Sequence, residues 1–245
     1  MKKNVQVNYI ESFGTQDGPG VRMVVFTQGC KMRCLYCQNP DTLPFKGGTS
    51  MTTEELMDKT LRQKEYFGTR GGVTISGGEP LLHAEALIPY FQALHQKGIN
   101  TALDTNGFVW NEHVEELLKH TDYVLLDIKH IDPKLHKKLT KVELQPIIEF
   151  ANKVKDYDVH LWVRYVLVPG WNDKEEHLRN WAKFVHGLGK VERVEVLPYH
   201  SLGVPKYLEL GKDYKLHDTP TPTVDLKEKT RKIFEQEGLT NIVVK

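Results

Sequence analysis

The chain has 245 residues, of which 40% are hydrophobic and 27% are charged, so it is long enough to bury a core of its own. Its 33 Lys and Arg residues are balanced by 32 Asp and Glu residues, with both signs interspersed. This balance argues against the strongly basic surface of a protein that binds a nucleic-acid backbone. We therefore expect no nucleic-acid partner.

The sequence has no candidate targeting or membrane segment. Residues 1–6 are followed by no apolar stretch of the signal-peptide type. No run approaches the roughly 20 apolar residues that a membrane-spanning helix needs. We expect a cytoplasmic protein that has no membrane partner.

Extended apolar segments alternate along the chain with helical patterns. Their nearly continuous Val, Ile and Leu content is typical of strands buried on both faces, as in a parallel sheet. The six segments are residues 21–26, 72–76, 99–104, 123–128, 159–168 and 191–197. Strand alternating with helix about six times predicts an α/β fold, either an open doubly wound sheet or a partial or closed barrel.

Helical patterns lie between these strands. Thr52 and Glu55 have capping-box spacing ahead of a helix that reaches about Tyr66. An apolar stripe predicts a helix over residues 84–94, in which Pro89 marks either a kink or a late start. Two further helices are predicted at 178–188 and 226–236, the second after a Thr- and Pro-rich surface loop at 219–223.

Polar residues follow the carboxyl ends of the predicted strands. Ligands of parallel α/β folds gather at that edge, so we expect these residues to form one site. In strand order they are the cysteine loop 29–40, then 76–80, 104–107, 127–129, Arg164 and 197–200.

The three cysteines, Cys30, Cys34 and Cys37, have C-x3-C-x2-C spacing. An odd number of cysteines within eight residues makes no complete disulfide framework. Three thiolates on a four-iron cluster leave one iron open to a substrate. A structural zinc site requires four ligands, and the next histidine along the chain is His83. A thioredoxin-like pair leaves Cys30 unexplained.

This motif, with Tyr36 just before the last cysteine, resembles the signature of the radical S-adenosylmethionine superfamily. Gly77-Gly78-Glu79 resembles the second motif of that superfamily, whose backbone meets the methionine amino group. Over essentially the whole chain, the similarity is to glycyl-radical activating enzymes of the pyruvate formate-lyase type. It is carried by residues 14–22, 104–108, 127–129, 164–170 and 197–200.

The resemblance implies a partial (β/α)6 TIM-like barrel with mainly parallel strands, in a single radical SAM domain over residues 1–245. The total of three cysteines leaves none for the ferredoxin-like insert that many relatives carry. Gln38 stands where the family often has His, so no role is assigned to that position.

The resemblance also implies roles for individual residues. Cys30, Cys34 and Cys37 would bind a [4Fe-4S] cluster, and Asp17 would contact the glycine-containing loop of the partner. Tyr36 is a candidate both for contacting that loop and for binding the cofactor. The residues implied to bind S-adenosylmethionine are Tyr36, Asn39, Gly77, Gly78, Glu79, Lys129, Arg164 and His200. Those implied to bind a monovalent cation, K⁺ or Na⁺, are Asp104, Thr105, the backbone of Leu125, and Asp127.

The function implied is the anaerobic activation of pyruvate formate-lyase. Reductive cleavage of S-adenosylmethionine gives a 5′-deoxyadenosyl radical, which abstracts a hydrogen from a glycine of the partner. We expect a low-potential electron donor such as flavodoxin, and a monomer. The alternatives are activation of a 2-ketobutyrate formate-lyase or an anaerobic ribonucleotide reductase, radical chemistry on a small molecule, or a non-catalytic metal- or cluster-binding module.

Overall fold

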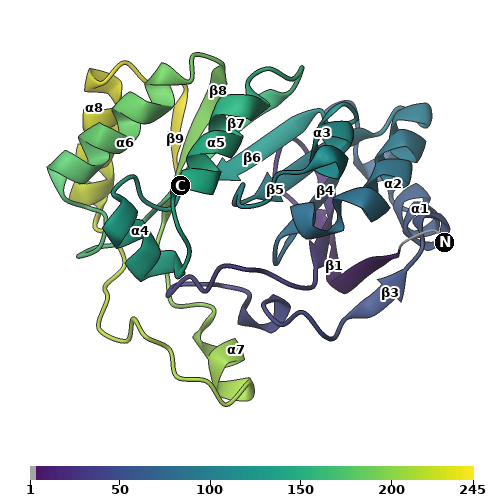
Figure 1. The fold of residues 1–245 in the computed structure, drawn as a ribbon, viewed down its shortest axis with the longest axis horizontal. Coiled ribbons are helices and arrows are strands. Elements are labelled where there is room, and N and C mark those ends of the chain that lie inside the picture. The colour runs from purple at the N-terminus through teal and green to yellow at the C-terminus, as the bar shows by residue number, and fades with distance from the viewer. Residues whose placement is uncertain (1–3) are drawn as a thin grey trace. The chain divides into compact units, whose positions relative to one another are not determined.

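The computed structural model describes residues 4–245, and the chain divides into two compact units. The first unit holds the residues up to 31 together with 42–125 and 156–160. The second holds residues 32–41, 126–155 and 161–245. Each unit combines strands with helices, which are labelled in Figure 1. The extent of one domain over residues 1–245 stays a prediction.

The first unit is built on five strands in the order β3-β1-β2-β4-β5. Strands β2, β4 and β5 are parallel, whereas β1 pairs antiparallel with both β2 and β3. All six residues of β2 are buried, as its continuous apolar pattern predicts. The bounds are β1 (Val5–Gly14), β2 (Arg22–Thr27), β3 (Thr49–Met51), β4 (Gly72–Gly77) and β5 (Asn100–Thr105), and β6 (Tyr123–Asp127) begins in this unit.

Three helices belong to the first unit: α1 (Thr53–Leu61), α2 (Ala84–Gln96) and α3 (Glu112–Leu118). Helix α2 lies between α1 and α3 (Figure 1). The capping box of Thr52 and Glu55 is present, because each side chain accepts a hydrogen bond from the backbone of the other. Helix α2 begins five residues before Pro89, so Pro89 does not mark a late start.

The second unit contains three parallel strands in the order β7-β8-β9. Its core is aromatic. The ring of Trp181 stacks on that of Phe234 with centroids 4.9 Å apart, and Trp181 Nε1 donates to the carbonyl of Ile128 over 2.9 Å. The strands are β7 (His160–Leu167), β8 (Val191–Pro198) and β9 (Ile242–Val244).

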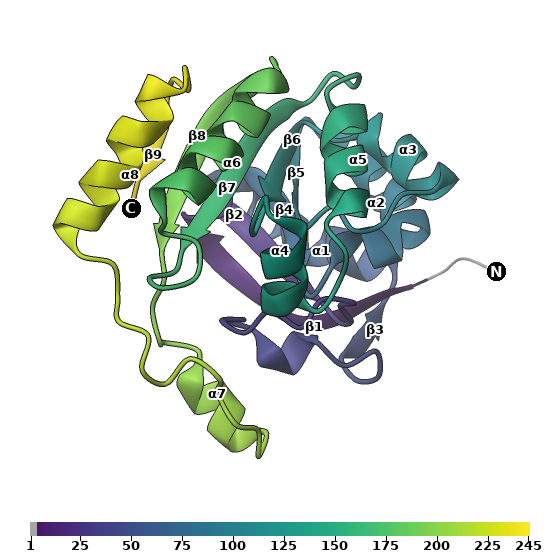
Figure 2. The same ribbon diagram turned by 60° about the vertical axis from the view of Figure 1, so that its left-hand side comes forward.

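The helices of the second unit are α4 (Pro133–Thr140), α5 (Gln145–Val154), α6 (Glu175–Gly187), α7 (Val204–Glu209) and α8 (Val224–Gln236). Helix α8 packs against α6 and β9, which Figure 2 shows from the side. All six predicted strands are present, as β2 and β4 to β8. No helix among residues 4–245 is both long and apolar enough to cross a membrane.

A buried histidine, His130, lies just before α4 and packs against His177 of α6. The backbone N–H of Asp132 donates to Nδ1 of His130 over 2.9 Å, which only the neutral ring accepts. The rings of His130 and His177 have centroids 4.7 Å apart. Burial, followed by the charge of His177, lowers the pKa of His130 from 6.5 to about 4.

We predict that acid weakens the fold through His130. The unfolded chain binds this proton near pH 6.5, but the folded chain binds it only near pH 4. The stability that His130 contributes is therefore complete above pH 6.5 and is lost as the pH falls from 6.5 toward 4. Between pH 7.5 and pH 5 this loss is about 2 kcal/mol.

The measurement is urea unfolding of the anaerobic protein across that pH range. His130→Asn keeps an acceptor for the Asp132 N–H but does not titrate, so it should lose less stability on acidification. His113→Asn changes a histidine on the exposed side of α3 and is the matched control. An unchanged pH dependence in His130→Asn would contradict the assignment.

Candidate functional site

The turn after β4 contains two glycines that allow a close backbone approach. Gly77 has φ +101°, and an ideal Cβ on it would lie 2.3 Å from the backbone nitrogen of Thr27. A Cβ on Gly78 would lie 2.2 Å from the carbonyl oxygen of Gly29. The Gly78 N–H donates to Thr27 and the Glu79 N–H donates to Gly29, each over 2.9 Å. The turn thus fixes the backbone immediately before Cys30.

Glu79 binds this turn to the end of β5. Its side chain is 1% exposed, and its carboxylate accepts hydrogen bonds from Thr105 Oγ1 at 2.5 Å and from the backbone N–H groups of Leu81 and Asn106 at 3.0 Å. Burial raises the pKa of Glu79 to about 7, and these three donors oppose the rise. The carboxylate is occupied within the protein, so the contact predicted for this motif would come from its backbone.

Cys30 is buried in the first unit, beside Asn106. The side-chain amide of Asn106 donates to Cys30 Sγ over 3.7 Å, and its Oδ1 accepts from the backbone of Phe108. The Cys30 N–H donates to the carbonyl of Leu43 over 3.3 Å. Hydrogen bonds to a ligating sulfur tune the reduction potential of a cluster. Sequence reasoning assigned no role to Asn106, although it lies in the matching segment 104–108.

The residues predicted to bind a cation divide between the two units. Asp104, Thr105 and Leu125 lie in the first unit and Asp127 in the second. Asp104 Oδ2 accepts from Ser76 Oγ over 2.7 Å, at the ends of neighbouring strands β5 and β4. No group of three or more His, Cys, Asp and Glu side chains within residues 4–245 is arranged to hold a metal ion. The cation site stays a prediction.

Asp17 lies in a loop whose backbone is hydrogen-bonded to a buried arginine, Arg22. Arg22 Nε donates to Thr74 Oγ1 over 2.6 Å, and Arg22 Nη1 donates to the carbonyl of Pro19 over 3.0 Å. Thr74 Oγ1 in turn donates to the carbonyl of Asp17 over 2.6 Å. Arg22 is fully buried, and burial lowers its pKa to about 10. The backbone at Asp17 is therefore held by a hydrogen bond to its carbonyl.

The cysteine loop in the second unit runs along the end of α4. The backbone N–H groups of Arg33 and Leu35 donate to the carbonyls of Thr140 and Leu139, over 2.8 and 3.0 Å. A turn in which the Cys37 N–H donates to the Cys34 carbonyl over 3.2 Å follows directly. This turn places Cys34 and Cys37 on either side of Tyr36.

Gln38, which had no predicted role, joins this loop to the segment after β8. Its Nε2 donates to the carbonyl of His200 over 2.9 Å and to that of Tyr36 over 3.1 Å. An ideal Cβ on Gly203 would lie 3.3 Å from the carbonyl oxygen of Cys37. The glutamine amide thus holds residues 200–203 against the last cysteine.

Tyr36 is buried in an apolar cluster of the second unit. Its ring is 4% exposed, and its hydroxyl oxygen has no hydrogen-bond partner within residues 4–245. Burial holds its pKa well above 10. The other buried members of this cluster are Leu139, Val168, Tyr199, Tyr207, Tyr214 and Leu216. Its predicted contact with a cofactor or with a partner stays a prediction.

Lys129 and Asp127 form a short ion pair, with Nζ 2.6 Å from Oδ2. Although burial favours the neutral amine, the charge of Asp127 and its neighbours keeps the pKa of Lys129 above its usual 10.5. The ammonium also lies 5.8 Å from the centroid of the Tyr36 ring. The second unit thus brings together three of the predicted site residues.

The other predicted cofactor contacts in the second unit have protein partners. Arg164 Nε donates to the buried carboxylate of Glu195 over 2.9 Å. Asn39 Oδ1 accepts from Lys206 Nζ over 2.9 Å. His200 Nδ1 accepts from the backbone N–H of Leu202 over 3.4 Å. Their roles toward S-adenosylmethionine stay predictions.

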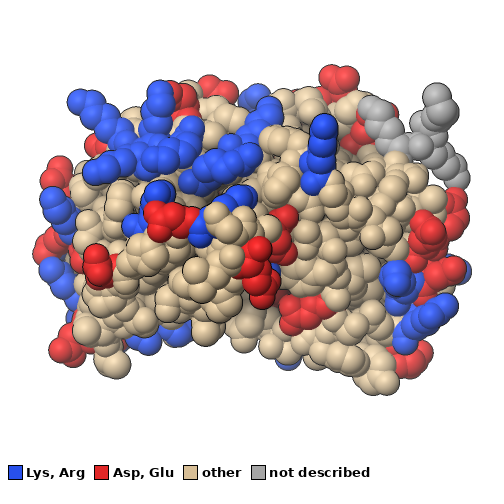
Figure 3. Space-filling view, turned by 90° about the horizontal axis from the view of Figure 1, so that it is seen from below, with Lys and Arg blue, Asp and Glu red and all other residues tan. Residues whose placement is uncertain are grey.

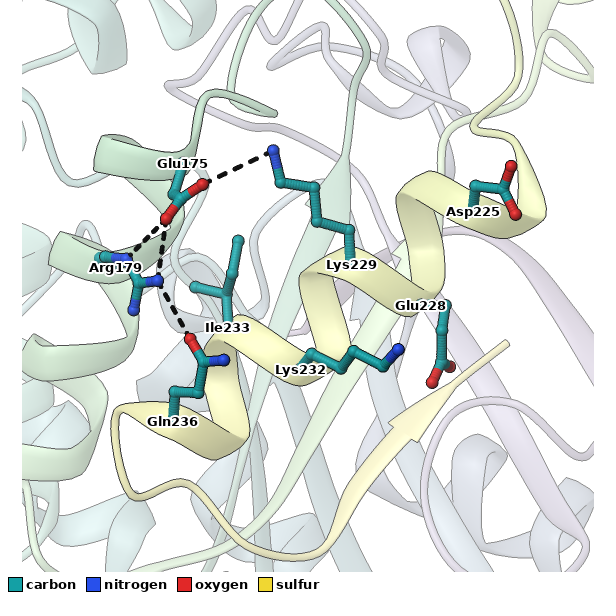
Figure 4. Close-up of a pocket in the computed structure, with 8 residues that line it drawn as sticks. All are labelled: Glu175, Arg179, Asp225, Glu228, Lys229, Lys232, Ile233 and Gln236. Carbon is teal, nitrogen blue, oxygen red and sulfur yellow. Dashed lines mark hydrogen bonds and ion pairs between the residues drawn. The ribbon is translucent and has the colours of Figure 1, made fainter.

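A groove between α6 and α8 contains none of the predicted residues. Three of its charged side chains, Glu175, Arg179 and Lys229, pair with one another (Figure 4). Arg179 donates to Glu175 over 2.8 Å and to Gln236 over 3.0 Å, and Lys229 Nζ lies 3.7 Å from Glu175. Such mutually neutralised charges make this groove a poor candidate site.

Comparison with known proteins identifies the family. Residues 24–182 match the radical SAM superfamily. The pyruvate formate-lyase 1-activating enzyme of Escherichia coli K12 is 42% identical over 236 residues, which cover 95% of this chain and 96% of that protein. This chain belongs to the radical SAM superfamily. A second relative, the pyruvate formate-lyase-activating enzyme of Clostridium pasteurianum, is 45% identical over 232 residues, covering 94% of this chain and 97% of that one.

Solved structures agree. A domain of the pyruvate-formate lyase-activating enzyme from Bacteroides vulgatus is 28% identical with a TM-score of 0.60, and the match covers 71% of this chain and 99% of that one. Streptococcus suis SuiB bound to S-adenosylmethionine is 21% identical with a TM-score of 0.66, and the match covers 88% of this chain and 48% of that one. The second likeness shows the fold alone. The predicted fold class, an α/β fold with a mainly parallel sheet like that of radical SAM barrels, is confirmed.

Membership of this superfamily implies a [4Fe-4S] cluster and S-adenosylmethionine. The donor set of this chain fits a cluster. All three cysteines are free of disulfide bonds, and thiolates are the ligands that iron–sulfur clusters require. The turn from Cys34 to Cys37 forms a loop without the cluster. The amide of Asn106 gives the sulfur of Cys30 a hydrogen bond.

We predict that Gly78→Ala disrupts the site. A methyl group 2.2 Å from the Gly29 carbonyl forces backbone movement just before Cys30, at a cost of about 2 kcal/mol or more in stability. Iron and sulfide bound per chain after anaerobic reconstitution should fall, together with the unfolding temperature.

Gly187→Ala is the matched control, because a Cβ at Gly187 meets no atom within 4 Å. It should keep full iron content. Normal iron content in Gly78→Ala would contradict the proposed constraint.

Proposed function

We propose that this protein activates pyruvate formate-lyase by generating a glycyl radical on it. The observation that carries the proposal is full-length similarity at 42–45% identity to proteins named for that activity. The match covers at least 94% of this chain and 96% of each relative, so the relatives have no additional domain to account for their activity.

The three cysteines would hold the cluster and leave one iron for the amine and carboxylate of S-adenosylmethionine. When bound and given one electron, the cofactor would supply the 5′-deoxyadenosyl radical that removes a hydrogen atom from the glycine of the partner. The tasks of the chain are to position the cofactor, to tune the cluster and to exclude water. The Gly77–Glu79 backbone and the half-buried Asp127–Lys129 pair are the groups that support cofactor positioning.

We also propose the finer features implied by the family. A flavodoxin or similar low-potential protein would supply the electron, and the enzyme would act as a cytoplasmic monomer. A monovalent cation would balance the carboxylates of Asp104 and Asp127, with Thr105 and the backbone of Leu125 completing its ligands. Oxygen ligands are suited to such hard cations.

The activity is tested with reconstituted enzyme, S-adenosylmethionine and pyruvate formate-lyase under reducing anaerobic conditions. We expect 5′-deoxyadenosine and a glycyl-radical EPR doublet on the partner. Cys30→Ala, Cys34→Ala and Cys37→Ala should each abolish both signals, because each removes an iron ligand.

Met32→Leu is the control for these variants, because it changes a buried side chain of the same loop at similar volume. Full activity in any cysteine variant would refute the cluster assignment. Deoxyadenosine without the doublet would indicate a different glycyl-radical enzyme as the partner.

We further predict that Asp17→Ala separates glycine activation from cofactor binding. The loop is anchored through the carbonyls of Asp17 and Pro19, and removing the carboxylate keeps the hydrogen bonds to both. The rate of glycyl-radical formation should fall about tenfold or more while the affinity for S-adenosylmethionine changes less than about twofold.

Gln16→Ala alters an exposed neighbour in the same loop and is the comparison variant. The two quantities are measured by EPR and by equilibrium binding to the loaded enzyme. A parallel loss of both would place Asp17 with the cofactor instead of the partner.

A further inference from the structure

Helix α4 and its C-cap residue carry a stripe of four lysines. Lys134, Lys137 and Lys138 are spaced i, i+3 and i+4, which aligns them on one face of the helix, and Lys141 follows as the C-cap residue. All four are exposed. The opposite face buries His136, Leu139 and Thr140. The stripe therefore points away from the core.

The positive charge of this stripe is only slightly neutralised. Glu143 pairs with Lys137. Lys138 lies 5.2 Å from the centroid of the Trp171 ring, and Lys141 donates to the carbonyl of Lys138 over 3.0 Å. Within residues 4–245, Lys134, Lys138 and Lys141 form no ion pair. Like charges at this spacing destabilise a helix, so the sequence retains an unfavourable arrangement.

The stripe lies beside the cysteine loop. The last two residues of α4 accept the backbone hydrogen bonds of Arg33 and Leu35, which flank Cys34 in the sequence. The Arg33 side chain is also exposed and adds a fifth cation one residue from Cys34. Figure 3 shows that Lys and Arg side chains gather on part of the face that is seen from below.

We propose that Arg33 and the α4 lysines form the docking surface for an acidic protein that delivers the electron. The inference rests on the proposed function, because only a cluster that must be reduced needs such a donor. Electron tunnelling falls steeply with distance, so a donor must dock close to a cluster ligand. Electron-transfer complexes are small and transient, and charge steering sets their association rates. A basic surface adjoining Cys34 meets both requirements.

The test compares two reductants on the loaded enzyme. An acidic flavodoxin hydroquinone needs a docking surface, whereas photoreduced 5-deazaflavin is a small reductant that does not. In K134E/K138E/K141E, stopped-flow reduction of the cluster by flavodoxin should slow about tenfold or more at low salt and lose most of its salt dependence. Reduction by deazaflavin should be unchanged.

K59E/K97E/K232E is the control, because it makes the same change in net charge at three exposed lysines elsewhere. K134Q/K138Q/K141Q provides a milder version that tests the same surface if charge reversal reduces yield. In this variant, reduction of the cluster by flavodoxin should also slow, but by a smaller factor.

Unchanged flavodoxin reduction in the α4 variants, or equal slowing in the control, would overturn the proposal. Normal flavodoxin reduction with a lower yield of glycyl radical under deazaflavin would also overturn it, because the surface would then serve the protein substrate. Failure of the wild-type enzyme to form any glycyl radical would refute the proposed function instead. The cluster reduction rates would still report on the surface.

Discussion

The first unit depends on one buried carboxylate. Glu79 is removed from water, which is costly for a charged group unless hydrogen bonds replace the lost solvation. The donors that replace it come from Leu81 in its own turn and from Thr105 and Asn106 after β5. Satisfying Glu79 therefore locks two strand ends together and places the amide of Asn106 against the sulfur of Cys30. The same turn contacts the backbone before Cys30 through glycines that leave no space for a side chain. This one requirement therefore helps to fix the backbone and the sulfur of Cys30, a predicted cluster ligand.

The same principle organises the charged residues elsewhere. Arg22 is fully buried with its guanidinium bonded to Thr74 and to backbone carbonyls, and this arrangement shapes the loop that presents Asp17. In the second unit, Arg164 pairs with Glu195 and Lys129 pairs with Asp127. Because buried charges are held by fixed partners, their side chains have little freedom to rearrange. Such preorganisation suits a site that must hold a reactive radical away from water.

The net charge of the chain gave no indication of the basic face on α4. Totals of 33 basic and 32 acidic residues predict a neutral surface on average. The helix nevertheless aligns Lys134, Lys137 and Lys138 because their spacing matches its period, and its register against Leu139 and Thr140 turns them outward. A local electrostatic potential of this kind depends on which residues share a face of the helix. The net charge of the chain does not contain that information.

Local patterns in the sequence determined the strands β2 and β4 to β8, the capping box of α1 and the three-cysteine motif, because each of these is encoded within about ten neighbouring residues. They did not reveal the short edge strands β3 and β9, whose residues become strands by pairing with β1 and β8. Nor did they reveal α4, in which few apolar residues mark the helical period. Tertiary structure alone decided that Gln38 bonds the carbonyl of His200 and that Asn106 reaches Cys30. Those partners are separated by 162 and 76 residues, and contacts over such separations depend on how the chain folds back on itself.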